Sequence, residues 1–337
     1  MIPPNELLRR HGLDAATEEA FPNDGWSGAT ITRLRDADGR AFVLKRDSPA
    51  ADWIARATND GPLLREAWFA GEGPALPWPA RNPAVGAAYD EATETSAVLM
   101  PDLTGILFDW NEPLPVGRLD PVLDALAALH GRDWGDGLEA GRAVWTPLGE
   151  RVSLICRTSL ERPGPAHDAV ADRLLPGWDA WDRRATPAAR RIIDDLANDP
   201  GPLLKALSAE PPTLLHGDLK LANAGIAADG SVELVDWQMV MMAPVAVELG
   251  WFLVANVNAL PLPPAAVLDR YWARRPDVEP SDRSRQDDLA ILVGLLLRGW
   301  RKGFDADAGI TLASGVSAAD DLRWWCDRAA AAVRVLG

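Results

Sequence analysis

The sequence predicts an α+β protein with a small, β-rich N-terminal lobe and a larger, mainly helical C-terminal lobe. Short strand-like runs bounded by turn residues gather in the first hundred residues. Apolar residues at helical spacing dominate the remainder. Pro101 ends the last strand-like run of the first part, so we predict lobes of residues 1–100 and 101–337.

The N-terminal lobe begins with a predicted hairpin. Residues 29–35 and 41–46 are strand-like, and the short turn between them contains Gly39. Residues 62–70 are predicted to be helical, with a proline near the start and an apolar stripe behind it. A loop over 71–86, rich in Pro and Gly, and a strand over 96–100 complete the lobe.

The C-terminal lobe is predicted to contain helices over 121–130, 190–196 and 287–300, from the spacing of their apolar residues. Two short β-like runs, at 213–215 and 231–235, interrupt this helical texture. Each run leads into a polar loop, which makes these loops the first place to look for chemistry.

Composition limits the function classes. The chain has 337 residues, 47 % of them apolar and 25 % charged, as in an ordinary globular protein. Its net charge of −15 is spread along the chain and disfavours nucleic acid as a partner. Two cysteines form no disulfide framework, and no signal-peptide core or apolar run of ~20 residues is visible. We therefore expect a cytoplasmic protein that does not bind membranes.

Polar side chains follow the two β-like runs. His216, Asp218 and Asn223 come after the first run, and Asp236 comes after the second. Carboxylate and amide oxygens of this kind suit Mg²⁺, which takes one or two protein carboxylates together with phosphates. A carboxylate that is not a metal ligand can accept the proton of a hydroxyl.

The motif His216-Gly217-Asp218, with Asn223 five residues after the aspartate and Asp236 followed by Trp237, resembles the aminoglycoside phosphotransferase and choline kinase family. That family is a small-molecule branch of the protein-kinase fold, whose catalytic loop and second aspartate have this spacing. The resemblance implies that Asp218 is the catalytic base and that Asn223 and Asp236 hold Mg²⁺. It allows Lys220 to neutralise charge on the transferred phosphoryl group, although an isolated lysine is also an ordinary solvated residue.

The N-terminal lobe resembles the same family. Lys45 ends a run that matches the protein-kinase strand carrying the phosphate-binding lysine. Glu66 lies where the family places the glutamate that pairs with this lysine. Ser27 and Gly28 belong to a weak Gly-rich loop, which the resemblance assigns to the nucleotide phosphates and which could otherwise be a simple turn.

Residues 97–103 resemble the family hinge, which binds the adenine edge. Aligned on Met100, the backbone C=O of Pro101 and the N–H of Leu103 are the expected contacts. Glu248 stands where the family usually has Asp, so its support of the catalytic loop needs a structural check.

The resemblance implies a kinase that transfers the γ-phosphate of ATP or GTP, with Mg²⁺, to a small-molecule hydroxyl. An aminoglycoside-like or other antibiotic or a sugar leads as acceptor, which would connect the chain with antibiotic resistance. A choline- or homoserine-like metabolite, a pseudokinase that only binds nucleotide and, more remotely, a protein kinase are the alternatives. Fifteen Trp residues could stack on a sugar or hold a cation, or simply pack the core. The acidic stretch 276–288 could bind a cationic aminosugar or be a solvated loop.

Overall fold

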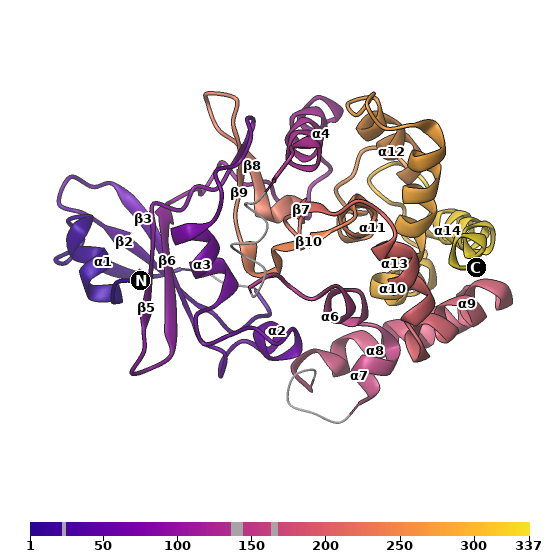
Figure 1. The fold of residues 1–337 in the computed structure, drawn as a ribbon, viewed down its shortest axis with the longest axis horizontal. Helices are drawn as coiled ribbons and strands as arrows, with labels where there is room; N and C mark the ends of the chain where they lie inside the picture. Colours follow the sequence, from indigo (N-terminus) through magenta and orange to yellow (C-terminus); the bar gives the residue numbers. More distant parts are fainter. Residues whose placement is uncertain (22–24, 136–143, 163–167) are drawn as a thin grey trace.

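The computed structural model describes residues 1–21, 25–135, 144–162 and 168–337. An antiparallel sheet forms the N-terminal end of the molecule, and most of the remainder is helical (Figure 1). The predicted α+β class with a β-rich first part and a helical second part is confirmed. The boundary at residue 100 stays a prediction.

The N-terminal sheet has five strands in the order β1-β2-β3-β6-β5, and all neighbouring pairs are antiparallel. Its strands are β1 (Thr17–Ala20), β2 (Thr30–Arg35), β3 (Ala41–Asp47), β5 (Gly86–Asp90) and β6 (Thr95–Pro101). The helices of this part are α1 (Pro4–Arg10), α2 (Trp53–Ala57) and α3 (Arg65–Glu72). In Figure 1, α3 lies beside the sheet on the side toward the helical part.

The predicted hairpin is β2–β3. Asp36 organises the turn, because its Oδ1 accepts the N–H groups of Asp38 at 3.0 Å and Arg40 at 2.8 Å. Leu34 and Leu44 point from the two strands into a small core under the sheet, where each is at most 1 % exposed.

Three expectations for this part need correction. The helix predicted from residue 62 begins at Arg65, after the extended Leu64. The predicted loop 71–86 contains the end of α3, the strand β4 (Ala80–Arg81) and the first residue of β5. The strands β1 and β5 were not predicted, since neither has a regular alternation of buried and exposed positions.

Two small sheets carry the polar loops. One pairs β7 (Thr213–Leu215) with β10 (Met241–Ala243), and the other has the order β4-β9-β8. In the second sheet, β8 (Ala224–Ile226) and β9 (Val232–Leu234) form a hairpin, and β4 lies parallel to β9. A strand from the first hundred residues therefore completes a sheet of the second part.

The helical part is built around α11 (Val245–Ala255) and α13 (Pro280–Ala308). The residues of α11 from Val245 to Val254 are all buried, as expected for a helix that is apolar on every side. The other helices are α4 (Val116–Gly131), α6 (Leu148–Ser153), α7 (Arg157–Glu161), α8 (Asp168–Arg184), α9 (Pro187–Asn198), α10 (Gly201–Ser208), α12 (Pro264–Trp272) and α14 (Ala318–Ala332). Short 3₁₀ turns cover Leu221–Asn223, Trp237–Met239 and Val333–Leu336.

The three predicted helices of this part lie inside α4, α9 and α13. The acidic stretch 276–288 is not a loop throughout, because α13 begins at Pro280. Cys156 and Cys326 are buried free thiols. Within the described ranges, no helix is long and apolar enough to cross a membrane.

Candidate active site

A cavity of about 270 Å³ lies between the N-terminal loop at residues 25–27, α2 and the helical part. Five residues singled out from the sequence line it: Ser27, Asp218, Lys220, Asn223 and Asp236. Its walls also include the indole side chains of Trp26, Trp53, Trp110, Trp251 and Trp300. The structure thus brings together polar residues from both parts of the chain.

Asp218 follows β7 on a tightly held loop. The Glu248 carboxylate in α11 accepts the N–H of His216 at 2.7 Å and the N–H of Gly217 at 3.0 Å. Arg151 Nε donates to the Gly217 carbonyl at 2.8 Å. Glu248 therefore supports the loop with both of its oxygens, which answers the question raised by its replacement of the usual Asp.

The loop requires glycine at position 217. Gly217 has φ +81°, and an added Cβ would lie 1.9 Å from the Met239 carbonyl oxygen. On the far side, Asn256 Oδ1 accepts the Leu221 N–H at 2.6 Å and its Nδ2 donates to the Leu219 carbonyl at 3.2 Å. The backbone on either side of Asp218 is therefore fixed by buried hydrogen bonds.

Asn223 and Asp236 are held next to each other by the β8–β9 hairpin. The Val235 N–H donates to the Asn223 carbonyl at 3.0 Å. Asn223 Nδ2 donates to the Asp218 carbonyl at 2.9 Å, which leaves the amide oxygen available to a ligand. Asp236 has a left-handed backbone, with φ 68° and ψ 59°, and its side chain lines the same cavity.

Lys45 links the two parts of the chain at this point. Its Nζ lies 2.6 Å from Glu66 Oε2 and 2.6 Å from Asp236 Oδ1. Burial opposes the charge on Lys45, but Asp236 and Glu66 outweigh it and raise the pKa of the ammonium group. Burial likewise opposes the charge on Asp236, and Lys45 and Lys220 hold its pKa below the ordinary value. Lysine and aspartate are therefore both charged at neutral pH.

An aromatic stack fixes the position of Glu66 relative to both polar loops. The Phe69 ring in α3 stacks on Trp237 at 4.4 Å between centroids, and Trp237 contacts the His216 ring at 4.5 Å. His216 Nε2 is 2.9 Å from the Val235 carbonyl oxygen. His216 thus braces the Asp218 loop against the Asp236 loop.

Lys220 lies close to the predicted base. Its Nζ is 2.9 Å from Asp218 Oδ2, and its side chain is 40 % exposed. The lysine is thus at the cavity and is not a remote solvated residue.

Ser27 of the Gly-rich loop belongs to the lining of the cavity, and Gly28 does not. Ser27 lines the cavity, and its carbonyl accepts the Trp53 N–H at 3.3 Å. Gly28 has φ +104°, and an added Cβ would lie 2.5 Å from the Ala51 carbonyl oxygen. The glycine is therefore required by its positive φ and by this contact with the chain before α2.

The predicted hinge lies at the end of β6. Met100 pairs with Val43 of β3, and the Asp102 N–H donates to the Ala41 carbonyl at 3.0 Å. Because bonded positions alternate along a strand, the Pro101 carbonyl faces the opposite edge, beyond the start of β5. Leu103 is 8 % exposed. Neither residue lines the cavity described above, so their nucleotide contacts stay a prediction.

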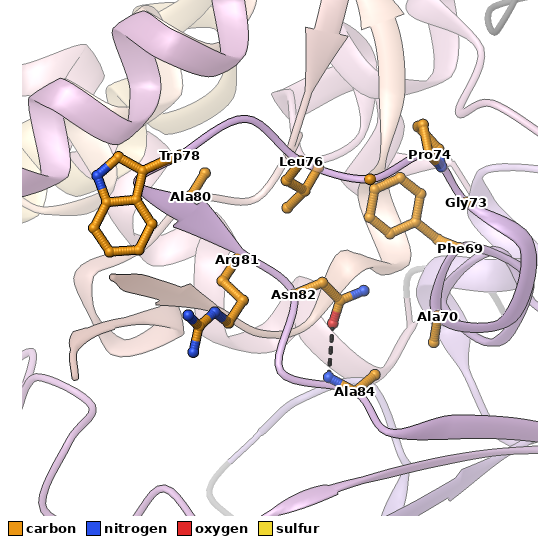
Figure 2. Close-up of a pocket in the computed structure, with 11 residues that line it drawn as sticks. Phe69, Ala70, Gly73, Pro74, Leu76, Trp78, Ala80, Arg81, Asn82 and Ala84 are labelled. Carbon is orange, nitrogen blue, oxygen red and sulfur yellow. Dashed lines mark hydrogen bonds between the residues drawn. The ribbon is translucent and has the colours of Figure 1, made fainter. Parts of the chain in front are cut away.

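A second pocket, of about 320 Å³, lies between α3 and the chain that leads through β4 (Figure 2). Phe69, Leu76, Trp78, Arg81 and Asn82 are among its lining residues. None of the residues predicted for the active site lines it. Two of its polar side chains have partners within the protein: Arg81 pairs with Asp229 at 2.9 Å, and Asn82 Oδ1 accepts the Ala84 N–H at 3.1 Å.

Sequence reasoning missed several residues of the cavity that Asp218 lines. Arg151 and Arg298 line it, together with Trp251 and Trp300. The two arginines are far apart in the sequence and belong to different helices, so no local spacing could have paired them. The high Trp content was a signal, but it did not separate cavity residues from core residues.

In the described residues, no group of three His, Cys, Asp or Glu side chains could hold a metal ion. Asn223 with Asp236 offers one amide oxygen and one carboxylate. This donor set fits Mg²⁺ bound mainly through nucleotide phosphates and water, and it does not fit a metal held by protein alone.

The sheet, the paired Lys45 and Glu66, and the His216–Asp218 loop define an α+β kinase-like fold. The chain belongs to the phosphotransferase enzyme family, whose family model matches residues 19–284. The resemblance recognised in the sequence is therefore confirmed. No curated protein matches the chain.

Solved structures of low identity are similar over nearly the whole chain. An aminoglycoside phosphotransferase from Alicyclobacillus acidocaldarius has 17 % identity and a TM-score of 0.45, covering 97 % of this chain and 93 % of its own. A choline/ethanolamine kinase family protein from Mesorhizobium loti has 16 % identity and a TM-score of 0.44, covering 95 % and 87 %. A macrolide 2′-phosphotransferase from Brachybacterium faecium has 19 % identity and a TM-score of 0.40, covering 90 % and 96 %. None of them identifies the acceptor of this chain.

Proposed function

We propose that this chain is a small-molecule kinase that transfers the γ-phosphate of ATP or GTP to a substrate hydroxyl. The observation that supports it most is the placement of Asp218, Asn223 and Asp236 on one cavity, with Lys45 joining Asp236 to Glu66. These are the oxygen ligands, base and lysine that phosphoryl transfer needs.

Each side chain has a role in this proposal. Asp218 accepts the proton of the acceptor hydroxyl as the hydroxyl oxygen forms its bond to the γ-phosphorus, and the bond from that phosphorus to the bridging oxygen of the leaving diphosphate breaks. Lys220, bonded to Asp218, offsets negative charge near the reacting groups. Asn223 and Asp236 would hold Mg²⁺, which neutralises phosphate charge when bound.

The nucleotide would lie against the N-terminal part. Lys45 would bind its α- and β-phosphates, with Glu66 fixing the lysine. Ser27 and Gly28 would cover the phosphates, and the Pro101 C=O and Leu103 N–H would bind the base next to Met100. We extend the proposal to the lobes themselves, with residues 1–100 binding nucleotide and 101–337 carrying the base and the acceptor.

The experiment uses purified full-length protein with ATP or GTP, Mg²⁺ and a panel of acceptors: aminoglycosides, macrolides, nucleoside antibiotics, sugars, choline and homoserine. Asp218→Asn should lower turnover of the accepted compound by a factor of about 100 or more. Asp236→Ala should do the same and weaken the dependence on Mg²⁺. Asp229→Asn, on an exposed turn, is the matched control and should behave like the unmodified chain.

Thermal unfolding measurements check that each variant is folded. Turnover close to that of the unmodified chain in Asp218→Asn would disprove the assigned base. Nucleotide binding without transfer to any acceptor, and without Mg²⁺-dependent hydrolysis, would favour the pseudokinase alternative.

A further inference from the structure

Two arginines, Arg151 and Arg298, lie at the cavity without a carboxylate partner among the residues that the structure describes. Arg151 of α6 is 1 % exposed, and its Nη1 has no hydrogen-bond acceptor in the described part of the chain. Arg298 of α13 lies where that helix departs from helical geometry, with φ −137° and ψ 26°. The Arg298 side chain makes no hydrogen bond or ion pair with the described residues, and its Nε is buried.

Such cations are costly to leave uncompensated. Burial lowers the pKa of Arg151 to about 10, although Asp218 and Glu248 act in the opposite direction. Burial and then Arg301 lower the pKa of Arg298, also to about 10. Elsewhere this protein pairs its buried cations: Lys302 Nζ lies 2.7 Å from Asp321, for example. The two cavity arginines depart from that rule.

Both arginines lie against the same indole ring. The guanidinium carbon of Arg151 is 4.5 Å from the Trp251 ring centroid, and that of Arg298 is 5.5 Å from it. Arg298 is also 5.1 Å from the centroid of Trp300. The indole N–H groups of Trp251 and Trp300 have no acceptor among the described residues. One region of the cavity therefore combines two cations, unused N–H donors and aromatic faces.

Among its described lining residues, the cavity has no set of carboxylates that could bind a cationic acceptor. Asp218 and Asp236 are the acidic residues that line it in the described ranges, and the proposed function already uses both. No residue of the acidic stretch 276–288 lines the cavity. Asp287 accepts the Trp272 N–H at 2.7 Å, and Asp288 pairs with Arg328 at 2.9 Å.

We propose that the acceptor carries an oxyanion group, a carboxylate or a phosphate, that Arg151 and Arg298 bind beside the hydroxyl to be phosphorylated. The ring or apolar face of this acceptor packs on Trp251 and Trp300. This inference rests on the proposed function, since it assigns the acceptor class of the same site. It disfavours a polycationic aminoglycoside, because the buried Arg151 and the partly buried Arg298 would repel it.

The test compares three probes that share a phenyl ring and a hydroxyl: 3-phenyllactate, the neutral 3-phenyl-1,2-propanediol and the cationic phenylalaninol. Binding to the full-length protein is followed by tryptophan fluorescence, which requires no turnover. Phenyllactate should bind at least about tenfold more tightly than the diol, and phenylalaninol most weakly. A second comparison uses phenyl phosphate and phenol in place of phenyllactate and the diol. It shows whether the favoured oxyanion is a phosphate or a carboxylate.

Arg298→Met should remove the preference for the oxyanion, with phenyllactate affinity falling about tenfold to the level of the diol. Arg298 is replaced instead of Arg151, because Arg151 also donates a hydrogen bond to the Gly217 carbonyl of the Asp218 loop. Arg323→Met is the matched control, an exposed arginine of α14 that should keep the preference. Equal or tighter binding of phenylalaninol, no binding of either oxyanion, or an unchanged preference in Arg298→Met would overturn the proposal.

Failure here is distinguishable from failure of the proposed function. Mg²⁺-dependent transfer that Asp218→Asn abolishes, combined with no oxyanion preference, would leave the kinase and remove only the acceptor class. If the protein proved not to be a kinase, the probe binding measurements could still be interpreted, because they involve no nucleotide.

Discussion

Glu248 accepts the backbone N–H of His216 at 2.7 Å from a fully buried position. Its second oxygen accepts the next amide along the loop. Burial disfavours the charged form, but His130 and His216 outweigh it and hold the pKa of Glu248 below its ordinary value. A carboxylate with two acceptor oxygens is therefore built under the loop that carries the proposed base.

Glu248→Gln should destabilise the protein and slow turnover. Glutamine keeps one acceptor oxygen and turns an NH₂ group toward a backbone donor, so one buried N–H loses its partner. We expect a loss of about 1–3 kcal/mol in the free energy of unfolding. Turnover should fall about tenfold or more, because the Asp218 loop shifts. Chemical denaturation and steady-state kinetics measure the two effects, and the exposed Glu112→Gln is the control. Unchanged stability would show that the amides do not need the carboxylate.

Gly217→Ala tests the close approach of the loop to Met239. The added Cβ would meet a carbonyl oxygen at 1.9 Å, so the loop has to move, and we expect a loss of more than about 2 kcal/mol and of nearly all activity. Gly39→Ala is a matched control, because Gly39 has the same φ of +81° but nothing within 4 Å of an added Cβ. Its cost should be about 1 kcal/mol. Equal losses in the two variants, measured by denaturation, would contradict the steric argument.

The buried pair of Lys302 and Asp321 joins α13 to α14 at 2.7 Å, with both side chains at most 4 % exposed. Lys302→Met should cost about 3–5 kcal/mol, because it leaves a buried carboxylate without a partner. The double variant with Asp321→Leu should recover most of that loss. Arg323→Met, in an exposed pair with Asp320, should cost less than about 1 kcal/mol. A double variant no more stable than Lys302→Met would show that the charge pair is not the cause.

The buried aspartates Asp47 and Asp52 should make the free energy of unfolding depend on pH. Burial, and then the charge of Asp52, raises the pKa of Asp47 to about 7. Between the ordinary carboxyl pKa of about 4 and that value, the folded state binds more protons than the unfolded state, so the free energy of unfolding falls as pH rises. Asp47→Asn should lessen this fall, and the exposed Asp38→Asn should not. Urea denaturation at pH 5 and pH 8 measures the change in the free energy of unfolding between these pH values. An equal change in Asp47→Asn and in the unmodified chain would contradict the prediction.

Local signals in the sequence predicted the parts of the fold that local chemistry determines. The β2–β3 hairpin follows from Asp36 and Gly39, and β7 has the bounds expected from its apolar run. The edge strands β1 and β5 carry no such signal, because tertiary pairing creates them. Helix α13 begins before residue 287 because Pro280 starts it, which the acidic composition of the stretch concealed.

The candidate site divides in the same way. The spacing of Asp218, Asn223 and Asp236, and of Lys45 and Glu66, follows a known motif, and the structure brings these residues together. Arg151 and Arg298 could not be paired from sequence, because only the fold places both against Trp251. The motif therefore indicates the chemistry, whereas the acceptor depends on contacts between distant helices.

The position of β4 has a consequence for dividing this molecule. Ala80 and Arg81 pair with Val232 and Glu233, so β9 has a neighbour on each side. A fragment that starts after the first hundred residues would leave one side of β9 bare. An unpaired strand edge can pair with strands of other molecules, so such a fragment should aggregate. The N-terminal and C-terminal parts therefore need to be produced as one polypeptide.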